Sequence, residues 1–416
     1  EEQIYWNLKT PLLVKVNDSN GIERVLAQIS DGENNITLIN EKYNGGQKEL
    51  DFNITFPKTG FYSKKNQYTL TFEVIDKSFW NFFMGNKASK TSTVIVDTKQ
   101  PNVYVVTNSY KITKGGSGAL IFKAEDENLK DVHIQTNFGK KFQASLFNDK
   151  GYYIAIVAWP VNQQTFSAEV VASDLAGNVA RSKIKYFLQD KTYRSSTIKL
   201  TDNFLTSSVS PLAEDFAPAE TSDLTPLEQF VFINEKIRQN SADTVQNITS
   251  VVTHEKPFTR IRPFFPLKNG ATVAGFGDFR LYEYNQNKVS QSYHLGLDMA
   301  STAEAEIVAS NPGKVAYAAE NGIYGNMILL DHGLGVYSLY AHCSSIAVNE
   351  GDEIISGQIL GRTGKTGFVF GDHLHFGIVV QGIEVRPEEW LDQKWLQDNI
   401  FDLINNANKI INNANS

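Results

Sequence analysis

The sequence predicts a mainly β protein in which a partly helical segment connects two N-terminal β-sandwich domains to a C-terminal antiparallel β domain. Three observations support this prediction. Short apolar or alternating runs separated by Asn, Asp and Gly fill the chain up to about residue 190, a helix-start signal lies near residue 225, and Gly-bounded β runs return after residue 262. At 416 residues, the chain is long enough for several domains.

An internal repeat divides the N-terminal part. "LLVKVNDSNGIERV" aligns with "LIFKAEDENLKDVH", and "FEVID…GN" aligns with "VVASDLAGN". Alternating runs broken by turn residues are typical of β-sandwiches. We therefore expect two similar sandwich domains at residues 1–98 and 99–190, and their "D-x-A-G-N" pattern resembles that of bacterial immunoglobulin-like (Ig-like) modules.

A linker that ends in a helix is predicted for residues 191–261. The polar, Pro-containing stretch "TSSVSPLAEDFAPAETSD" has the composition of a loop. In "TPLEQFVFINEKIRQ", Thr225 is a candidate N-cap, Pro226 stands at the first helical position, and Glu228 completes a capping box.

Residues 262–416 form the predicted C-terminal β domain. Strand signals occur in "GKVAYAA", "NMILLDHG", "GVYSLYAH" and "HLHFGIVV". The last stretch, "WLQDNIFDLINNANKIINNANS", predicts an Asn-rich helix that frays at the end of the chain.

Composition excludes several function classes. The net charge of -7 disfavours non-specific binding to nucleic acid, which needs a basic surface. The single cysteine, Cys343, excludes an intrachain disulfide and a multi-cysteine zinc site. The sequence has no apolar run of about 18 residues that would span a membrane. Because the chain begins at Glu1 without a signal-like segment, the protein is either cytosolic or was exported or anchored by a segment outside this numbering.

Histidines cluster in the C-terminal domain, where His294, His332, His342, His373 and His375 lie close together in the sequence. Histidine and carboxylate are the common ligands of catalytic zinc. The histidines could instead be polar residues on an exposed sheet face, and His332 in "DHG" suits a turn or a strand end.

The motif "HLGLDMA" offers His294 and Asp298 as a ligand pair. On an extended strand the two residues would be about 13 Å apart, too far to share one ion, and Gly296 argues against a helix. We therefore expect a bend near Gly296 that brings the pair together, with Leu295 and Leu297 pointing into the core.

The motif "HLH" places His373 and His375 on one face of a strand, about 6.6 Å apart. Leu374 and Phe376 then pack behind them. Three protein ligands and an open position are typical of catalytic zinc, and one histidine of this motif would be the third ligand.

The motif "VYSLYAH" follows the same alternation. Val336, Ser338, Tyr340 and His342 should share one face of a strand. His342, at its end, should point into the same cleft as His373.

The ordered set "GFGDFRLY", "HLGLDMA", "GIYGN", "YAH", "GDHLHFG" and "VRPEEW", over about residues 265–392, is similar to the LytM/lysostaphin-type zinc peptidases. The resemblance implies one Zn²⁺ per chain, held by His294, Asp298 and His375, and two catalytic histidines, His342 and His373. Cys343 departs from the common Leu after "YAH", and we expect it to be buried and inert.

Two further residues are candidate substrate contacts. Arg280 in "FGDFR" either lines the groove or forms an ion pair with Asp278. Tyr324 in "GIYGN" either contacts substrate or packs in a turn.

The resemblance also implies a function. Family members cut peptides in bacterial cell walls, so we expect an endopeptidase that binds the stem peptides and crosslinks of peptidoglycan. The acidic balance and multidomain layout favour the periplasm or envelope of a Gram-negative bacterium, where the crosslink joins D-alanine to meso-diaminopimelate. Cleavage of glycine bridges is one alternative, and a non-catalytic regulator or wall-binding protein is another.

Two expectations concern the parts outside the peptidase region. The sandwich domains would suit an envelope protein partner. Upstream segments in similar enzymes can cover the groove, so we expect residues 191–261 to inhibit the enzyme in part.

Overall fold

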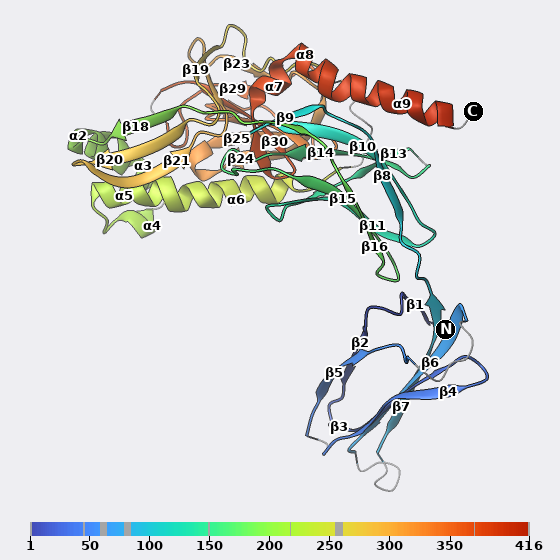
Figure 1. The fold of residues 1–416 in the computed structure, drawn as a ribbon. Helices are drawn as coiled ribbons and strands as arrows, with labels where there is room; N and C mark the ends of the chain where they lie inside the picture. The colour runs from blue at the N-terminus through green and yellow to red at the C-terminus, as the bar shows by residue number, and fades with distance from the viewer. Residues whose placement is uncertain are drawn as a thin grey trace. The chain divides into compact units, whose positions relative to one another are not determined.

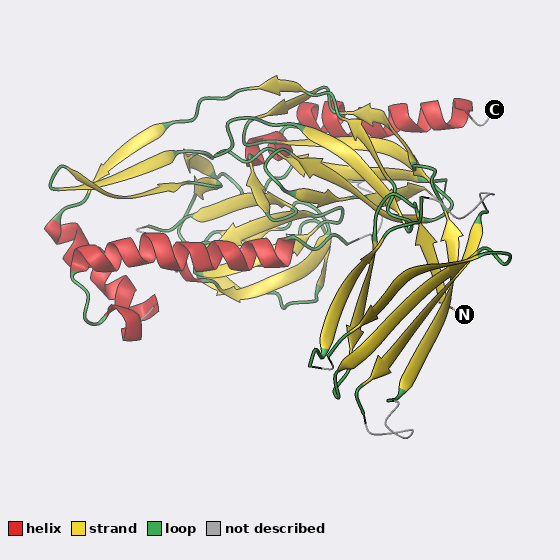
Figure 2. Cartoon of the chain, turned by 60° about the horizontal axis from the view of Figure 1, so that its bottom comes forward, coloured by secondary structure: helices red, strands yellow, loops and turns green. Residues whose placement is uncertain are grey.

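The computed structural model describes residues 2–44, 46–58, 65–78, 85–148, 150–216, 218–253, 261–369 and 371–414. Strands dominate over helices (Figure 2), as the predicted fold class requires. The described helices precede or follow the C-terminal sheet in the sequence, except for a short 3-10 helix at Gly322–Tyr324. In these described ranges, no helix has the length and apolar character needed to cross a membrane.

The first sandwich consists of a five-stranded sheet, in the order β1-β7-β6-β3-β4, and a two-stranded sheet, β2-β5. Its strands are β1 (Glu2–Trp6), β2 (Leu12–Asn17), β3 (Ile22–Ser30), β4 (Asn35–Lys42), β5 (Glu49–Ile54), β6 (Gln67–Asp76) and β7 (Lys87–Val96). Val16 and Phe52 of the small sheet share one buried cluster with Val25, Tyr68 and Val94 of the large sheet, so the two sheets enclose a common core.

The second sandwich has two four-stranded sheets, β13-β14-β10-β8 and β12-β11-β15-β16, and a short parallel pair, β9 and β17. Its strands are β8 (Asn102–Asn108), β9 (Lys111–Thr113), β10 (Ser117–Glu125), β11 (Leu129–Thr136), β12 (Lys141–Gln143), β13 (Ser145–Asn148), β14 (Tyr152–Ala158), β15 (Ala168–Asp174), β16 (Val179–Lys183) and β17 (Phe187–Gln189).

The sequence repeat has a structural counterpart in the two sandwiches. The backbone N–H of Asn20 donates to Oδ1 of Asp18 at 2.8 Å, and the backbone N–H of Asn128 donates to Oδ1 of Asp126 at 2.8 Å. Asp and Asn favour such side-chain-to-backbone turns, so the aligned positions form the same local structure.

The chain divides into two compact units. One contains residues 1–103, 124–132 and 171–181, and the other contains residues 104–123, 133–170 and 182–416. The larger unit therefore joins most of the second sandwich to the helical segment and to the C-terminal sheet. The domain bounds 1–98, 99–190, 191–261 and 262–416 stay predictions.

Polar side chains join the second sandwich to the C-terminal part inside this larger unit. The Glu389 carboxylate accepts hydrogen bonds from the backbone N–H of Ser117 at 2.9 Å and from its hydroxyl, and the Trp390 indole donates to the same hydroxyl. The Gln381 amide exchanges hydrogen bonds with the backbone of Gln143, at 2.8 and 3.0 Å. Ser117, Gln381, Glu389 and Trp390 are buried, so these hydrogen bonds hold the two parts together.

Helices cover most of residues 202–249. They are α2 (Asp202–Phe204), the π-helical η1 (Leu205–Val209), α3 (Ser210–Phe216), α4 (Pro218–Thr221), α5 (Pro226–Phe232), the π-helical η2 (Ile233–Ile237) and α6 (Arg238–Thr249). The predicted capping box is confirmed, because the Thr225 side chain accepts from Glu228 N–H while the Glu228 carboxylate accepts from Thr225 N–H.

The predicted loop before Thr225 is wrong, because most of "TSSVSPLAEDFAPAETSD" (residues 206–223) lies in η1, α3 and α4. Polar side chains there bond back to the helix itself, as when the Ser207 hydroxyl donates to the Asn203 carbonyl at 2.6 Å. Leu205, Val209 and Ala213 are buried, so tertiary packing outweighs the weak helix propensity of the Ser and Pro residues. Residues 254–260 of the predicted linker lie outside the described residues.

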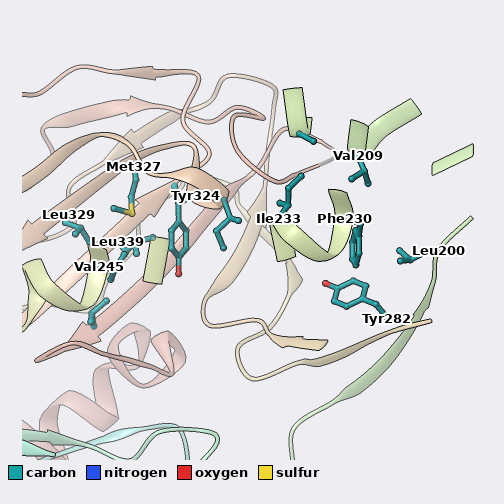
Figure 3. Close-up of a cluster of buried hydrophobic side chains, with 14 of the residues drawn as sticks. Leu200, Val209, Phe230, Ile233, Val245, Tyr282, Tyr324, Met327, Leu329 and Leu339 are labelled. Atoms are coloured by element: carbon teal, nitrogen blue, oxygen red, sulfur yellow. The ribbon is translucent and has the colours of Figure 1, made fainter. Parts of the chain in front are cut away.

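The helical segment packs on one face of the C-terminal β domain. Figure 3 shows the shared cluster, with Val209, Phe230, Ile233 and Val245 from the helices and Tyr282, Tyr324, Met327, Leu329 and Leu339 from the β domain. The rings of Phe230 and Tyr282 meet edge to face, with centroids 4.9 Å apart. Burial of such aromatic pairs stabilises the packing.

The C-terminal sheet has eight strands, in the order β19-β22-β30-β26-β25-β24-β28 with β31 paired to β30. Figure 1 labels four of them, β19, β24, β25 and β30. They are β19 (Ala271–Ala274), β22 (Leu297–Ala300), β24 (Gly313–Glu320), β25 (Asn326–Asp331), β26 (Val336–Ala341), β28 (Glu353–Ile354), β30 (Leu374–Val380) and β31 (Ile383–Val385).

Two three-stranded sheets and the last helices complete the chain. The sheets run β18-β20-β21 and β23-β29-β27. Their strands are β18 (Ser195–Lys199), β20 (Phe279–Tyr284), β21 (Asn287–Tyr293), β23 (Glu306–Val308), β27 (Ser345–Ile346) and β29 (Ile359–Arg362). The helices are η3 (Gly322–Tyr324), α7 (Pro387–Leu391), α8 (Gln393–Leu396), the π-helical η4 (Gln397–Phe401) and α9 (Asp402–Ala414).

Candidate metal centre

A bend at Gly296 brings His294 and Asp298 together. Strand β21 ends before His294 and β22 begins at Leu297, and the Nε2 atom of His294 lies 2.9 Å from Oδ1 of Asp298. Leu297 is buried as predicted. The prediction for Leu295 is wrong, because this side chain lines the cavity next to His294. The bend interrupts the strand alternation on which that prediction depended.

Three candidate ligand atoms converge. Besides the His294–Asp298 distance, Nδ1 of His375 lies 2.9 Å from Oδ1 of Asp298 and 3.2 Å from Nε2 of His294. Ligand atoms of a tetrahedral zinc ion at about 2.0–2.2 Å lie roughly 3.4 Å from one another, so these residues fit such an ion after small adjustments. Two histidines and one carboxylate also match the donor set of catalytic zinc sites, which keep one position open.

The backbone orients His294 for metal binding. Its Nδ1 atom lies 2.8 Å from the carbonyl oxygen of Gly275. Because a carbonyl oxygen can only accept, Nδ1 carries the proton and Nε2 presents its lone pair to the centre.

Gly296 leaves room for the ring of His375. A Cβ atom on Gly296 would lie 2.5 Å from Nε2 of His375 and 2.7 Å from the carbonyl oxygen of Phe376. Only glycine therefore fits between the bend and β30 without moving a ligand. Leu374 and Phe376 are fully buried behind the histidine pair, as predicted.

Two more histidines stand beside the three. The rings of His342 and His373 have centroids 4.9 Å apart, and Nε2 of His373 lies 3.5 Å from Oδ1 of Asp298. Nδ1 of His342 donates to the Thr366 carbonyl at 2.9 Å, and Nδ1 of His373 donates to the Gly371 carbonyl at 2.8 Å. Each ring therefore keeps Nε2 for accepting or donating a proton.

His342 reaches the centre by a route that alternation does not predict. In β26, Tyr340 packs against Phe376 behind the sheet, whereas Ala341 pairs with His375. Regular alternation would send His342 to the back with Tyr340. Its backbone instead has a φ of 65°, a left-handed conformation that turns the side chain to the front. The prediction that Ser338 and Tyr340 share its face is therefore wrong.

The surroundings shift the pKa values of Asp298, His342 and His373 in different directions. Burial alone would raise the pKa of Asp298, but hydrogen bonds with His294, His373 and His375 hold that pKa well below its usual value. Burial, followed by the nearby His375 and His373, lowers the pKa of His342. Burial also lowers the pKa of His373 and is the largest single effect, but the hydrogen bonds with Asp298 and the Gly371 carbonyl and the charges of Asp298 and Asp372 together outweigh it, so the net pKa is raised.

His332 and Cys343 have structural roles outside this centre. The His332 ring bonds to the Pro312 carbonyl through Nδ1 at 2.7 Å and to the Ser338 hydroxyl through Nε2 at 2.8 Å, and burial lowers its pKa to about 4. Cys343 is buried, as predicted, and burial raises the pKa of its thiol to about 12. A thiol with that pKa stays protonated and unreactive near neutral pH.

A cavity of about 760 Å³ contains the centre. Its lining includes all five histidine and carboxylate side chains described above, that is, His294, Asp298, His342, His373 and His375. Arg280 also lines it, with Nε 3.4 Å from Asp278 and Nη2 4.0 Å from Asp298, so the two roles considered for Arg280 coexist.

Tyr324, the second candidate substrate contact, also lines the cavity, together with residues that motif reasoning did not single out. Tyr324, largely buried, has its ring 5.7 Å from that of His375. Phe230, Asn234 and Arg238 line the cavity from the helical segment, and Glu384 lines it from β31. No sequence signal identifies Arg238, because most helical arginines face solvent.

Part of the chain is similar to known proteins. Residues 292–387 match peptidase family M23. Mpg of Neisseria meningitidis, named a DD-carboxypeptidase/endopeptidase, is 35% identical over 94 residues, which are 23% of this chain and 22% of that protein. NlpD of Escherichia coli, named a murein hydrolase activator, is 35% identical over 107 residues, or 25% of this chain and 28% of that protein.

The chain also matches a solved structure. A putative peptidase M23 from Pseudomonas aeruginosa is 19% identical, covering 67% of this chain and 94% of that chain, with a TM-score of 0.37. The chain spans less than a third of the length of the two curated relatives.

Proposed function

Because residues 292–387 match peptidase family M23, we propose that this protein is a zinc-dependent endopeptidase that hydrolyses peptide crosslinks of bacterial peptidoglycan. The observation that carries the proposal is the convergence of His294, Asp298 and His375, whose ligand atoms lie 2.9–3.2 Å apart beside two further histidines.

These three side chains would hold one zinc ion. When bound, zinc supplies Lewis-acid activation of water and of the scissile carbonyl. The backbone carbonyl at Gly275 keeps Nε2 of His294 directed at the ion, which fixes one ligand before metal binds.

His342 and His373 would move protons. Both rings are fixed by a carbonyl on Nδ1, so Nε2 is the atom that exchanges a proton with the attacking water or the leaving amine. A protonated Nε2 would also stabilise negative charge on the carbonyl oxygen. The buried wall around them, including Tyr324, limits access of bulk water to these steps.

The proposed bond joins D-alanine to meso-diaminopimelate, and the proposed place of action is the periplasm or envelope of a Gram-negative bacterium. The name of the Neisseria relative, a DD-carboxypeptidase/endopeptidase, supports this bond. The acidic net charge also suits an envelope enzyme better than a cationic secreted bacteriolysin. The sandwich domains are proposed to bind an envelope partner.

Digestion of purified peptidoglycan tests the proposal. Zinc-loaded wild type should release the two peptides of the crosslink, identified by mass spectrometry, and His294→Ala should release none. Intact wall after incubation with the zinc-loaded protein would contradict the proposal.

A non-catalytic activator is the second candidate, favoured by the similarity to NlpD. Metal analysis separates the two. One zinc per chain supports the enzyme, whereas purified protein that binds no zinc and stimulates a separate wall hydrolase supports the activator.

A further inference from the structure

Arg238 is a cationic side chain in the wall of the metal-centre cavity, and no carboxylate of the described residues pairs with it. It is partly buried at the start of α6, where its Nε and Nη2 atoms donate only to the carbonyl and amide oxygens of Asn234, at 2.9–3.2 Å. Among the residues that the structure describes, no carboxylate lies within ion-pair distance of its guanidinium. A buried charge without a counter-ion is costly, so its retention points to an anionic ligand.

A second arginine faces the same cavity. Arg280 of β20 lies 4.0 Å from Asp298, so its guanidinium is next to the metal centre. Burial first, and also the positive charge of Arg280, lowers the pKa of Arg238. Two like charges therefore face one cavity, and an anion between them would relieve both the desolvation and the repulsion.

The other carboxylates in the cavity wall have their own partners. Glu235 accepts a hydrogen bond from the Ser290 hydroxyl at 3.0 Å, and Glu384 is hydrogen-bonded to Tyr324. Neither is within ion-pair distance of Arg238, so neither replaces a bound anion.

We propose that Arg238 and Arg280 form a subsite for a substrate carboxylate that is attached to the carbon next to the scissile nitrogen. The inference rests on the proposed function and specifies its substrate class. Where D-alanine is joined to meso-diaminopimelate, the scissile nitrogen sits on a carbon that carries a free carboxylate. A glycine inside a glycine bridge has no such group.

The position of Arg280 suits this carboxylate. A group bound by its guanidinium would lie within a few ångströms of Asp298 and hence of the bond to be cut. Guanidinium groups bind carboxylates through paired, charge-assisted hydrogen bonds, which give direction as well as affinity. The helical segment would then supply a specificity residue for the pocket, in addition to its packing role.

Binding to the metal-free full-length protein tests the subsite without turnover. The two ligands are a crosslinked muropeptide dimer and the same dimer with this carboxylate converted to a carboxamide, each titrated by calorimetry. Wild type should bind the carboxylate form about 10- to 100-fold more tightly, the range expected for hydrogen bonds to a charged group. Arg238→Gln should reduce this ratio to a few-fold. Arg238→Lys keeps the charge but lacks the planar guanidinium that donates paired hydrogen bonds, so it should give an intermediate ratio.

Lys236→Gln is the matched control. Lys236 is exposed in η2, the π-helical turn directly before α6, and its replacement removes the same charge without changing the cavity lining. It should keep the wild-type ratio. Circular dichroism establishes that each variant is folded.

Two results would overturn the subsite: equal affinity of wild type for the two ligands, or an Arg238→Gln variant that weakens both equally. Cleavage after zinc is added back is scored separately. A protein that prefers the carboxylate but cuts neither ligand would refute the proposed hydrolase activity and leave the subsite standing.

Discussion

His373 and His375 approach the same oxygen of Asp298, His375 through Nδ1 at 2.9 Å and His373 through Nε2 at 3.5 Å. Only His375 also lies within 3.2 Å of Nε2 of His294. The two histidines of one motif therefore occupy different places, one inside the ligand set and one beside it.

This difference predicts that one substitution removes zinc and the other removes only turnover. His375→Ala should lose bound zinc, because a ligand is removed. His373→Ala should keep about one zinc per chain and lose about 10²–10⁴-fold in turnover, the range for loss of a general acid or base. Metal content by mass spectrometry and muropeptide release measure the two quantities. Loss of zinc from both variants would contradict the assignment.

Gly296→Ala should weaken metal binding. The new Cβ atom would press on the His375 ring and on the backbone of Phe376, so a ligand must move. We expect about 10- to 100-fold lower zinc affinity, as for other changes that misplace a ligand, measured by competition with a chromophoric chelator. Gly46→Ala, in the first sandwich, is the control, because a Cβ atom there meets nothing within 4 Å. Equal affinities for the two variants would show that Gly296 is not needed for the ligand geometry.

Glu389 should make stability depend on pH. Burial raises its pKa from 4.5 to about 7, although hydrogen bonds from Ser117 and the charge of Arg386 lower it. Because the pKa is higher in the folded state, its contribution is fully present below pH 4.5 and is lost as the pH rises through 7. A shift of this size corresponds to about 3 kcal/mol in the free energy of unfolding.

Denaturant unfolding at pH 5 and pH 8 measures this effect. Wild type should lose stability relative to Glu389→Gln between the two values, since the amide does not ionise. Identical pH dependence of the two proteins would contradict a titrating carboxyl at this position.

Partial inhibition by residues 191–261 stays a prediction, and Phe230 and Arg238 in the cavity wall motivate it. Faster cleavage by a 262–416 fragment than by the full chain, with circular dichroism to establish folding, would support inhibition. Equal rates would contradict it. Inhibition changes the rate on all substrates, whereas loss of the carboxylate subsite changes the ratio between two substrates.

Local rules predicted much of the structure. The Thr225 cap, the bend at Gly296 and the buried side of "HLH" follow from turn chemistry, glycine and strand alternation, which act over a few residues. His342 was placed in the right cleft for the wrong reason, because one left-handed residue reverses the alternation and the sequence does not mark it.

The helices before Thr225 could not be predicted from local sequence rules. These helices begin at Asp202 because Leu205 and Val209 become buried, and this gain exists only once the β domain is present. The place of Arg238 depends on the same packing, so it too could not be read from the sequence.

Gln381, buried against Gln143 of the second sandwich, directly follows β30, the strand that carries His375. Six residues of continuous strand, roughly 20 Å, therefore connect the sandwich to a metal ligand without an intervening loop. A strand is stiff along its length, so a displacement of the second sandwich would be transmitted through β30 to His375. A partner bound to the second sandwich would therefore also set the position of the metal centre relative to the substrate.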